Sequence, residues 1–196
     1  MTSFDVLSFV LQKTDYGEVD AWIDMVTDRF GRIGCHVRGV SYLKSKLRYS
    51  LEPYSLVKAT ILQTKSGQWR LINAVLIKNL YYDLSNKDRE VIVRLQNLLS
   101  RVVPPDELSS FEYETDLLQA LQNNTSIILN NYLLVAIDIL RRNGYIDEVQ
   151  LASEFPNKVL KSGDNLYEQI TQSKLSDTAK LRLQKIIISS LQNSGL

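Results

Sequence analysis

The sequence predicts an α+β protein in two parts: a small five-stranded β-barrel over residues 1–82, followed by an all-α helical domain over residues 83–196. The apolar residues alternate with a period of two up to about residue 82, which is typical of strands. Beyond that point they recur about every 3.6 residues, which is typical of helices. With 196 residues, of which 44% are hydrophobic and 23% charged, the chain can form two small domains, each with a core.

Five runs in the first part are expected to be strands. They are residues 4–13, 21–30, 33–39, 54–65 and 69–82. The third run shows the alternation most clearly, because Ile33, Cys35 and Val37 share one face while His36 and Arg38 share the other. Short glycine-containing turns join the strands, except for a longer link between the third and fourth. Five strands so connected suit a Greek-key barrel of the OB type, whose closure removes exposed edges.

The second part is expected to be a helical bundle. Ser85 is a predicted N-cap with Asp88 as its capping partner, and the prolines at 104 and 105 end this first helix. A second helix is expected over 111–121 and a single buried central helix over 126–143, with Gly144 as its C-terminal cap. A short helix over 164–172 and a terminal helix opening at Ser176 complete the prediction, with a domain boundary near residues 82–85.

Several classes of function are disfavoured by composition. The chain has one cysteine, Cys35, and one histidine, His36, so a cysteine-based zinc site or a catalytic triad is hard to assemble. Phosphate-binding and hydrolase motifs are lacking. We therefore expect no enzyme activity, no metal and no cofactor. No apolar run is long enough to span a bilayer and no basic leader is seen, so a cytoplasmic, nucleoid-associated protein is expected.

Charge is distributed unevenly along the chain. The formal net charge is only +1, yet nine Lys or Arg and a single acid, Glu52, fall between Arg29 and Arg70. This stretch carries +8 and the rest of the chain −7. A concentrated basic region beside an acidic body is typical of a protein that holds a polyanion at one place. The simpler alternative is that these basic residues only line the solvent-exposed faces of strands.

The densest basic segment is residues 37–48, expected to be a loop that leaves the third strand. The candidate contacts to a nucleic acid are Arg29, Arg32, Arg38, Lys44, Lys46 and Arg48, with Tyr42 as a candidate for stacking on bases. An equally supported alternative to base stacking is that Tyr42 packs over the open end of the barrel. Tyr54 and Trp69 are expected in the core.

Several segments together resemble the RecO family of bacterial recombination mediators and DNA-repair proteins. The matching pieces are VLQKTDYGEVD (10–20), VTDRFGRIGCHVRGV (26–40), KSKLR (44–48), LEPYSLVKATI (51–61) and, in the helical part, LLVAIDILRRNGY (133–145). The likeness covers roughly residues 5–82 and is thinner beyond. It implies an OB-like barrel and a helical domain. The family's four-cysteine zinc knuckle is missing, because residues 146–163 contain no cysteine.

The resemblance implies a non-enzymatic function. The family binds single- and double-stranded DNA, promotes annealing and helps to load recombinase on strands coated by single-strand-binding protein (SSB). Its partners include the acidic tail of SSB and the mediator RecR. Arg141 and Arg142, at the end of the predicted central helix, are the candidate cations for that tail, although cations there also suit the helix dipole.

The sequence is also compatible with two other functions. The first is an OB-fold protein-interaction module of a repair complex, with weak or no DNA binding of its own. The second is a nuclease, suggested by four acids that could attract Mg²⁺: Asp15, Glu18, Asp20 and Asp24. On a strand these acids would be too widely spaced to chelate a metal tightly without help.

Overall fold

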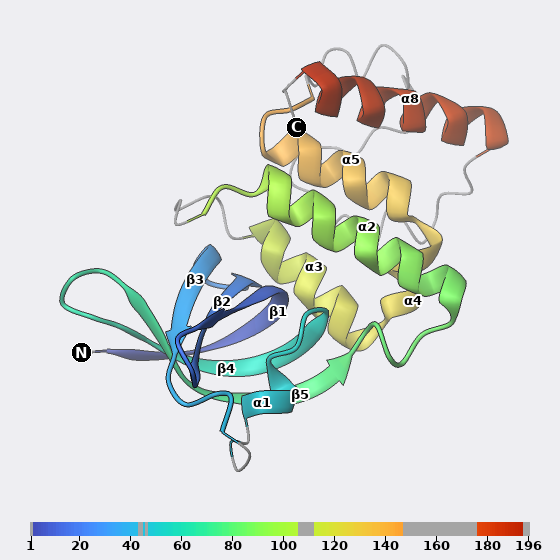
Figure 1. Cartoon of the computed structure of the whole chain (residues 1–196). Helices are drawn as coiled ribbons and strands as arrows, with labels where there is room; N and C mark the ends of the chain where they lie inside the picture. Colours follow the sequence, from blue (N-terminus) through green and yellow to red (C-terminus); the bar gives the residue numbers. More distant parts are fainter. Residues whose placement is uncertain (1, 43–44, 46, 106–111, 147–175, 194–196) are drawn as a thin grey trace. The chain divides into compact units, whose positions relative to one another are not determined.

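The computed structural model describes residues 2–42, 45, 47–105, 112–146 and 176–193. Five strands, with one short helix between the third and the fourth, are followed by the longer helices (Figure 1). The strands are β1 (Ser3–Tyr16), β2 (Asp20–Thr27), β3 (Gly31–Val37), β4 (Ser55–Gln63) and β5 (Trp69–Asn79). They close into a barrel in the order β1-β2-β3-β5-β4, antiparallel except for the β3–β5 pair. The predicted α+β class and the five strands are confirmed, and the closed order is consistent with the predicted OB-type barrel.

The barrel interior is filled by side chains that alternate along the strands. Ile23 and Met25 from β2 meet Ile33, Cys35 and Val37 from β3, all of them almost completely buried. One end of the barrel holds three aromatic rings, because Phe30 packs against Phe4 and Trp69 with centroids 5.0 Å and 4.7 Å away. Trp69 is thus a core residue, as the sequence predicts.

The link between β3 and β4 contains a short helix that the sequence does not reveal. Helix α1 (Leu47–Ser50) is only one turn long, too short to produce a periodic pattern. Val40 before it and Leu51 after it are completely buried in the barrel core. Tyr54 was expected in the core and is instead half-buried, with φ of 67° and its ring stacked on Tyr81 at 5.2 Å.

Two helices pack against the barrel. Helix α2 (Asn86–Val102) contacts β1, and α3 (Glu112–Asn123) contacts β1, β2 and β4. Phe9, Leu11 and Val26 lie outside the barrel's interior cluster, yet all three are buried to 1% exposure or less. The helices therefore cover one region of the barrel's outer surface.

Polar contacts hold α2 and α3 in place. A β-bulge at Leu11 interrupts the β1–β2 ladder, and Gln96 of α2 donates a hydrogen bond of 2.9 Å to the Leu11 carbonyl. On α3, the Thr115 hydroxyl donates to the Asp28 carbonyl at 2.9 Å. Lys78 of β5 donates to the carbonyl of Gln122 at 3.0 Å.

The chain divides into two compact units, residues 1–123 and 124–196. The predicted domain boundary at 82/83 therefore lies inside the first unit, because α2 and α3 pack with the barrel. Ser85 caps α2 as expected: its hydroxyl accepts from the Asp88 N–H and donates to the Asp88 carboxylate at 2.7 Å.

The second unit contains α4 (Thr125–Asn130), α5 (Tyr132–Arg142) and α8 (Asp177–Asn193), with α8 packed on α5 (Figure 1). The single helix predicted over 126–143 is wrong: it is broken at Asn131, whose φ of −125° is not helical. An apolar pattern can continue through such a break, so periodicity alone does not reveal it. The predicted helix over 164–172 lies outside the described residues.

The ends of α5 and α8 follow the predicted capping chemistry. Gly144 adopts φ of 77°, a conformation that favours glycine, and its N–H donates to the Arg141 carbonyl while that of Tyr145 donates to Leu140. This pair of bonds is a Schellman motif. At the start of α8, the Ser176 hydroxyl accepts from the Ala179 N–H. None of the helices in the described parts of the chain is long and apolar enough to cross a membrane.

Asp28, at the β2–β3 turn, makes the stability of the first unit depend on pH. Burial raises the pKa of its carboxyl above the ordinary 3.8, although hydrogen bonds, including one from the Leu7 N–H at 3.1 Å, and the Arg29 charge act in the opposite direction. Above 3.8, the folded state therefore binds more protons at this group than the unfolded state, and its contribution to stability falls as pH rises.

Asp28→Asn keeps the hydrogen bond to Leu7 and removes the charge. We expect the variant to become more stable relative to the wild type as pH rises through the window above 3.8. Urea unfolding of both proteins at a series of pH values, about 3 to 6, measures this difference. A variant that instead loses stability relative to the wild type as pH rises would contradict the assigned role of burial.

Candidate nucleic-acid interface

Part of the outer face of β1, β2 and β3 is open to solvent. The strand register places Thr14, Trp22 and His36 side by side on this face, with Tyr16 and Asp20 paired in the next row. Tyr16 and Trp22 are 66% and 42% exposed. The open region therefore displays aromatic side chains at the β1–β2 turn and at the end of β3.

Beside these residues lies an open hollow with a volume of about 1010 Å³. Its described lining is Val19, Asp20, Arg38, Gly39, Ser41, Tyr42 and Ser45. The lining comes from the β1–β2 turn and from the segment that follows β3. The β1–β2 turn belongs to the regions that OB-type barrels use for ligand binding, which are the face of strands 2 and 3 and the loops joining strands 1–2 and 4–5.

Asp20 connects the two walls of the hollow. One of its carboxylate oxygens accepts the Gly39 N–H at 2.8 Å, and the other lies 3.2 Å from Nε2 of His36. The Ser41 N–H donates to the Val19 carbonyl at 3.0 Å, which adds a backbone link. The chain leaving β3 is thereby fastened to the β1–β2 turn.

Tyr42 lies over Gly39, and both readings of its role are compatible with this position. A Cβ on Gly39 would come within 2.9 Å of the Tyr42 ring, and Gly39 has φ of 64°. Both the close contact and the backbone conformation therefore require glycine at this position. The side chain is nevertheless 59% exposed. One side of the ring packs on the backbone, while much of the rest is accessible to a ligand.

Three of the predicted contacts lie along one segment. Arg38 is exposed and lines the hollow with Tyr42. Arg48 is half-buried on α1, with its guanidinium 5.8 Å from the centre of the Tyr49 ring. Lys44 and Lys46 lie outside the described residues. Glu52, the only acid in the basic stretch, is paired with Lys13 of β1 at 2.7 Å.

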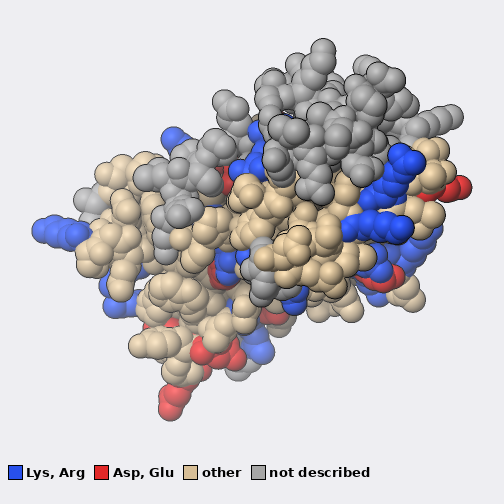
Figure 2. Space-filling view, turned by 90° about the horizontal axis from the view of Figure 1, so that it is seen from above, with Lys and Arg blue, Asp and Glu red and all other residues tan. Residues whose placement is uncertain are grey.

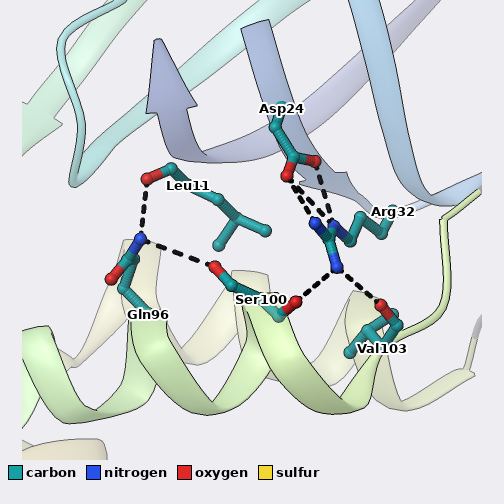
Figure 3. A network of polar contacts seen from close by, with 6 residues as sticks. All are labelled: Leu11, Asp24, Arg32, Gln96, Ser100 and Val103. Carbon is teal, nitrogen blue, oxygen red and sulfur yellow. Dashed lines mark hydrogen bonds and ion pairs between the residues drawn. The ribbon is translucent and has the colours of Figure 1, made fainter. Parts of the chain in front are cut away.

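Arg32 has a structural position, which corrects its assignment as a DNA contact. Its guanidinium forms a two-pronged ion pair with Asp24, from one Nη to Oδ2 at 2.7 Å and from Nε to Oδ1 at 3.1 Å, and donates to the carbonyls of Ser100 and Val103 at the end of α2 (Figure 3). The side chains of Arg32 and Asp24 are only 17% and 18% exposed. A largely buried guanidinium held by one carboxylate and two carbonyls is not available to a phosphate.

Arg29 lies at the opposite end of β3 from Arg38. Its guanidinium is 5.9 Å from the centre of the Phe4 ring. Because β3 has seven residues at about 3.3 Å each, the two arginines are separated by on the order of 20 Å. The structure therefore does not bring Arg29 into the hollow. On the face drawn in Figure 2, the described Lys and Arg side chains are interrupted by uncharged and acidic residues.

The acids proposed for a nuclease do not converge. Among the described residues, no group of three or more His, Cys, Asp or Glu could hold a metal ion. Asp24 is paired with Arg32, and Asp20 contacts Gly39 and His36. These contacts give both carboxylates a structural role.

Arg141 and Arg142, the candidate partner contacts, share one carboxylate. Arg141 lies 3.0 Å and Arg142 2.9 Å from the two oxygens of Asp138, whose side chain is 3% exposed. The three groups together carry a net charge of +1. This arrangement neutralises a buried acid within the last turns of α5.

Sequence reasoning missed Trp22 and Tyr16 as exposed residues. One signal for Trp22 was present, since the alternation places it on the same strand face as Asp24, and a charged residue marks an outward face. The hollow itself had no local signal, because its walls come from segments about twenty residues apart.

The fold and the site define a small β-barrel with an open, aromatic and partly basic sheet face beside a loop-lined hollow. Residues 1–81 match the family described as "Recombination protein O N terminal". The chain is also similar to the DNA repair protein RecO of Myxococcus xanthus (strain DK1622), with 26% identity over 94 residues, which are 48% of this chain and 38% of that protein. The resemblance seen in the sequence is confirmed over residues 1–81, which match the N-terminal part of the RecO family. The match spans well under half the length of this curated relative.

Proposed function

We propose that the protein acts in DNA repair as a recombination mediator and that its barrel binds DNA without strong sequence preference. The observation that carries the proposal is the exposed pair of Arg38 and Tyr42 at the hollow, at the start of the most basic segment of the chain. The match of residues 1–81 to the RecO N-terminal family supports the same role.

The chemistry of this segment suits a polyanion. Each Lys or Arg that neutralises a phosphate releases a counterion, which gives affinity without base recognition and a steep dependence on salt. Since Glu52 is paired with Lys13, the one acid of the stretch already has a cation from β1. The proposed phosphate contacts are Arg38, Lys44, Lys46 and Arg48, with Tyr42 contacting bases. Arg32 is not included.

Three further activities are proposed from the resemblance to the RecO family. They are binding of both single- and double-stranded DNA, annealing, and assistance to recombinase loading on SSB-coated strands. The partners proposed with them are the SSB tail and RecR. The net charge of +1 on Arg141, Arg142 and Asp138 is compatible with binding the tail's terminal carboxylate as a second anion.

The test is charge reversal in the basic segment. Lys44→Glu/Lys46→Glu/Arg48→Glu should lower affinity for a labelled single strand about 100-fold or more and flatten the dependence of log affinity on log salt, because up to three phosphate contacts are lost. Fluorescence anisotropy at several salt concentrations measures both quantities.

A matched variant changes the same charge elsewhere on the first unit. Lys58, Lys65 and Lys87 are exposed on β4, the β4–β5 turn and α2. Lys58→Glu/Lys65→Glu/Lys87→Glu should reduce affinity far less. Equal losses in the two triple variants would show that net charge, and not this segment, determines binding.

A second candidate function is an OB-fold protein-interaction module of a repair complex. Three apolar side chains of β5 favour it, since Ile72, Val75 and Leu76 are 55%, 57% and 39% exposed. Exposed apolar residues of this kind suit a protein partner. An absence of DNA binding by the wild type, even at low salt, would make this module the leading function.

A further inference from the structure

Four neighbouring strands carry a row of side chains across the open barrel face. Trp22 of β2 pairs with Thr14 of β1 and His36 of β3, and His36 pairs in turn with Arg70 of β5. Paired residues point to the same side of a sheet, so these four side chains line up across the barrel. Tyr16 adjoins the row, with its ring 5.7 Å from that of His36 in an edge-to-face arrangement.

Trp22 is held flat against the sheet by a glycine. A Cβ on Gly34 of β3 would lie 2.6 Å to 2.8 Å from three atoms of the indole, so the ring occupies the space that any side chain would fill. With 42% of the residue still exposed, the indole packs on the backbone on one side and is accessible on the other.

The charges around the row favour a nucleic acid over a cation. The two carboxylates of β2 are already engaged: Asp24 pairs with Arg32, and Asp20 contacts His36 and the Gly39 N–H. Arg70 is exposed at one end of the row. Exposed Arg38 comes two residues after His36 along the chain. An aromatic surface flanked by cations is the arrangement that binds single strands, with bases stacked on rings and phosphates on the cations.

We propose that Trp22, flanked by His36 and Tyr16, stacks on unpaired bases and that Arg70 contacts the adjoining phosphate. This face would therefore distinguish single-stranded from duplex DNA. The inference rests on the proposed DNA-binding function and deepens it. The bases of a duplex are stacked on one another, so a flat indole on a sheet cannot reach their faces, whereas a single strand can present them.

Intrinsic fluorescence tests the stacking directly. The chain has two tryptophans, and the other, Trp69, is 8% exposed in the barrel core. In Trp69→Phe, emission comes from Trp22 alone. Titration with an oligothymidylate of about 20 nucleotides should quench this emission, while a duplex hairpin of similar length should leave it nearly unchanged.

Affinity measurements on the full chain complete the test. Trp22→Ala should lower affinity for the oligothymidylate about tenfold, the order expected for one stacked base, and change duplex affinity by less than twofold. Trp22→Phe should retain most of the affinity. Tyr82→Ala, which removes a 70% exposed ring away from the row, is the matched control and should have no effect. Trp69 emission verifies that the Trp22 variants are folded.

The outcomes separate the two proposals. If the wild type binds neither form of DNA, both the proposed function and the stacking site are overturned. If the wild type binds DNA but Trp22→Ala does not weaken single-strand binding, or weakens single-strand and duplex binding equally, only the stacking site is overturned.

Discussion

Replacement of Arg32 by methionine should lower the free energy of unfolding of the first unit by about 3 kcal/mol, the cost typical of removing one partner of a buried ion pair. The substitution leaves the Asp24 carboxylate largely buried without its cation and removes the donor to the Ser100 and Val103 carbonyls (Figure 3). Urea unfolding followed by the emission of Trp69, buried in the barrel, measures the change.

Two further variants separate the ion pair from other effects. Arg29→Met removes an exposed arginine five residues after Asp24 and should change stability by less than about 0.5 kcal/mol. Arg32→Met/Asp24→Asn should recover part of the lost stability, because no buried charge remains. A large loss of DNA affinity in folded Arg32→Met, with stability unchanged, would contradict the structural role and restore Arg32 as a phosphate contact.

A fragment of residues 1–123 should fold cooperatively, whereas a fragment of residues 1–82 should be largely unfolded at 25 °C. The shorter fragment lacks α2 and α3, so Phe9, Leu11 and Val26 lose their cover on the outside of the barrel. Exposing three such side chains costs about 1.5–3 kcal/mol each, which together is comparable with the whole stability of a small domain.

Circular dichroism and the emission maximum of Trp69 in the two fragments measure this difference. A control carries Phe9→Ser, Leu11→Ser and Val26→Thr in the shorter fragment, which should improve its solubility without restoring the helices' contacts. A cooperative transition of the unmodified 1–82 fragment would show that the barrel folds alone and would support the boundary predicted from the sequence.

The strands were predictable because each has one face in a single apolar core. That requirement places an apolar residue at every second position of the strand. Arg32 could not be assigned in this way, since its outward position on β3 looks the same for a phosphate contact and for a pair with Asp24. Only the approach of α2, more than sixty residues later in the chain, decides between the two roles. The break at Asn131 was hidden for a different reason, because apolar residues continue on both sides of it.

The candidate site was predicted in part. Arg38 and Tyr42 were found because charge and aromatic character are properties of single residues. The Trp22 ring can lie flat on the sheet and stay accessible because Gly34 of the neighbouring strand has no side chain. No local sequence pattern shows that these two residues lie next to each other.

Carboxylates attach the chain to the barrel on both sides of the densest basic part, at Gly39 and at Glu52. Asp20 holds Gly39 at the start, and Lys13 holds Glu52 at the finish. With its ends fixed, the chain between them can lengthen at a cost of only about 0.6 kcal/mol for each doubling in length. Insertions or deletions between these two attachments should therefore leave the barrel beneath unchanged, and under the proposed function they would alter only the number of cations available to DNA.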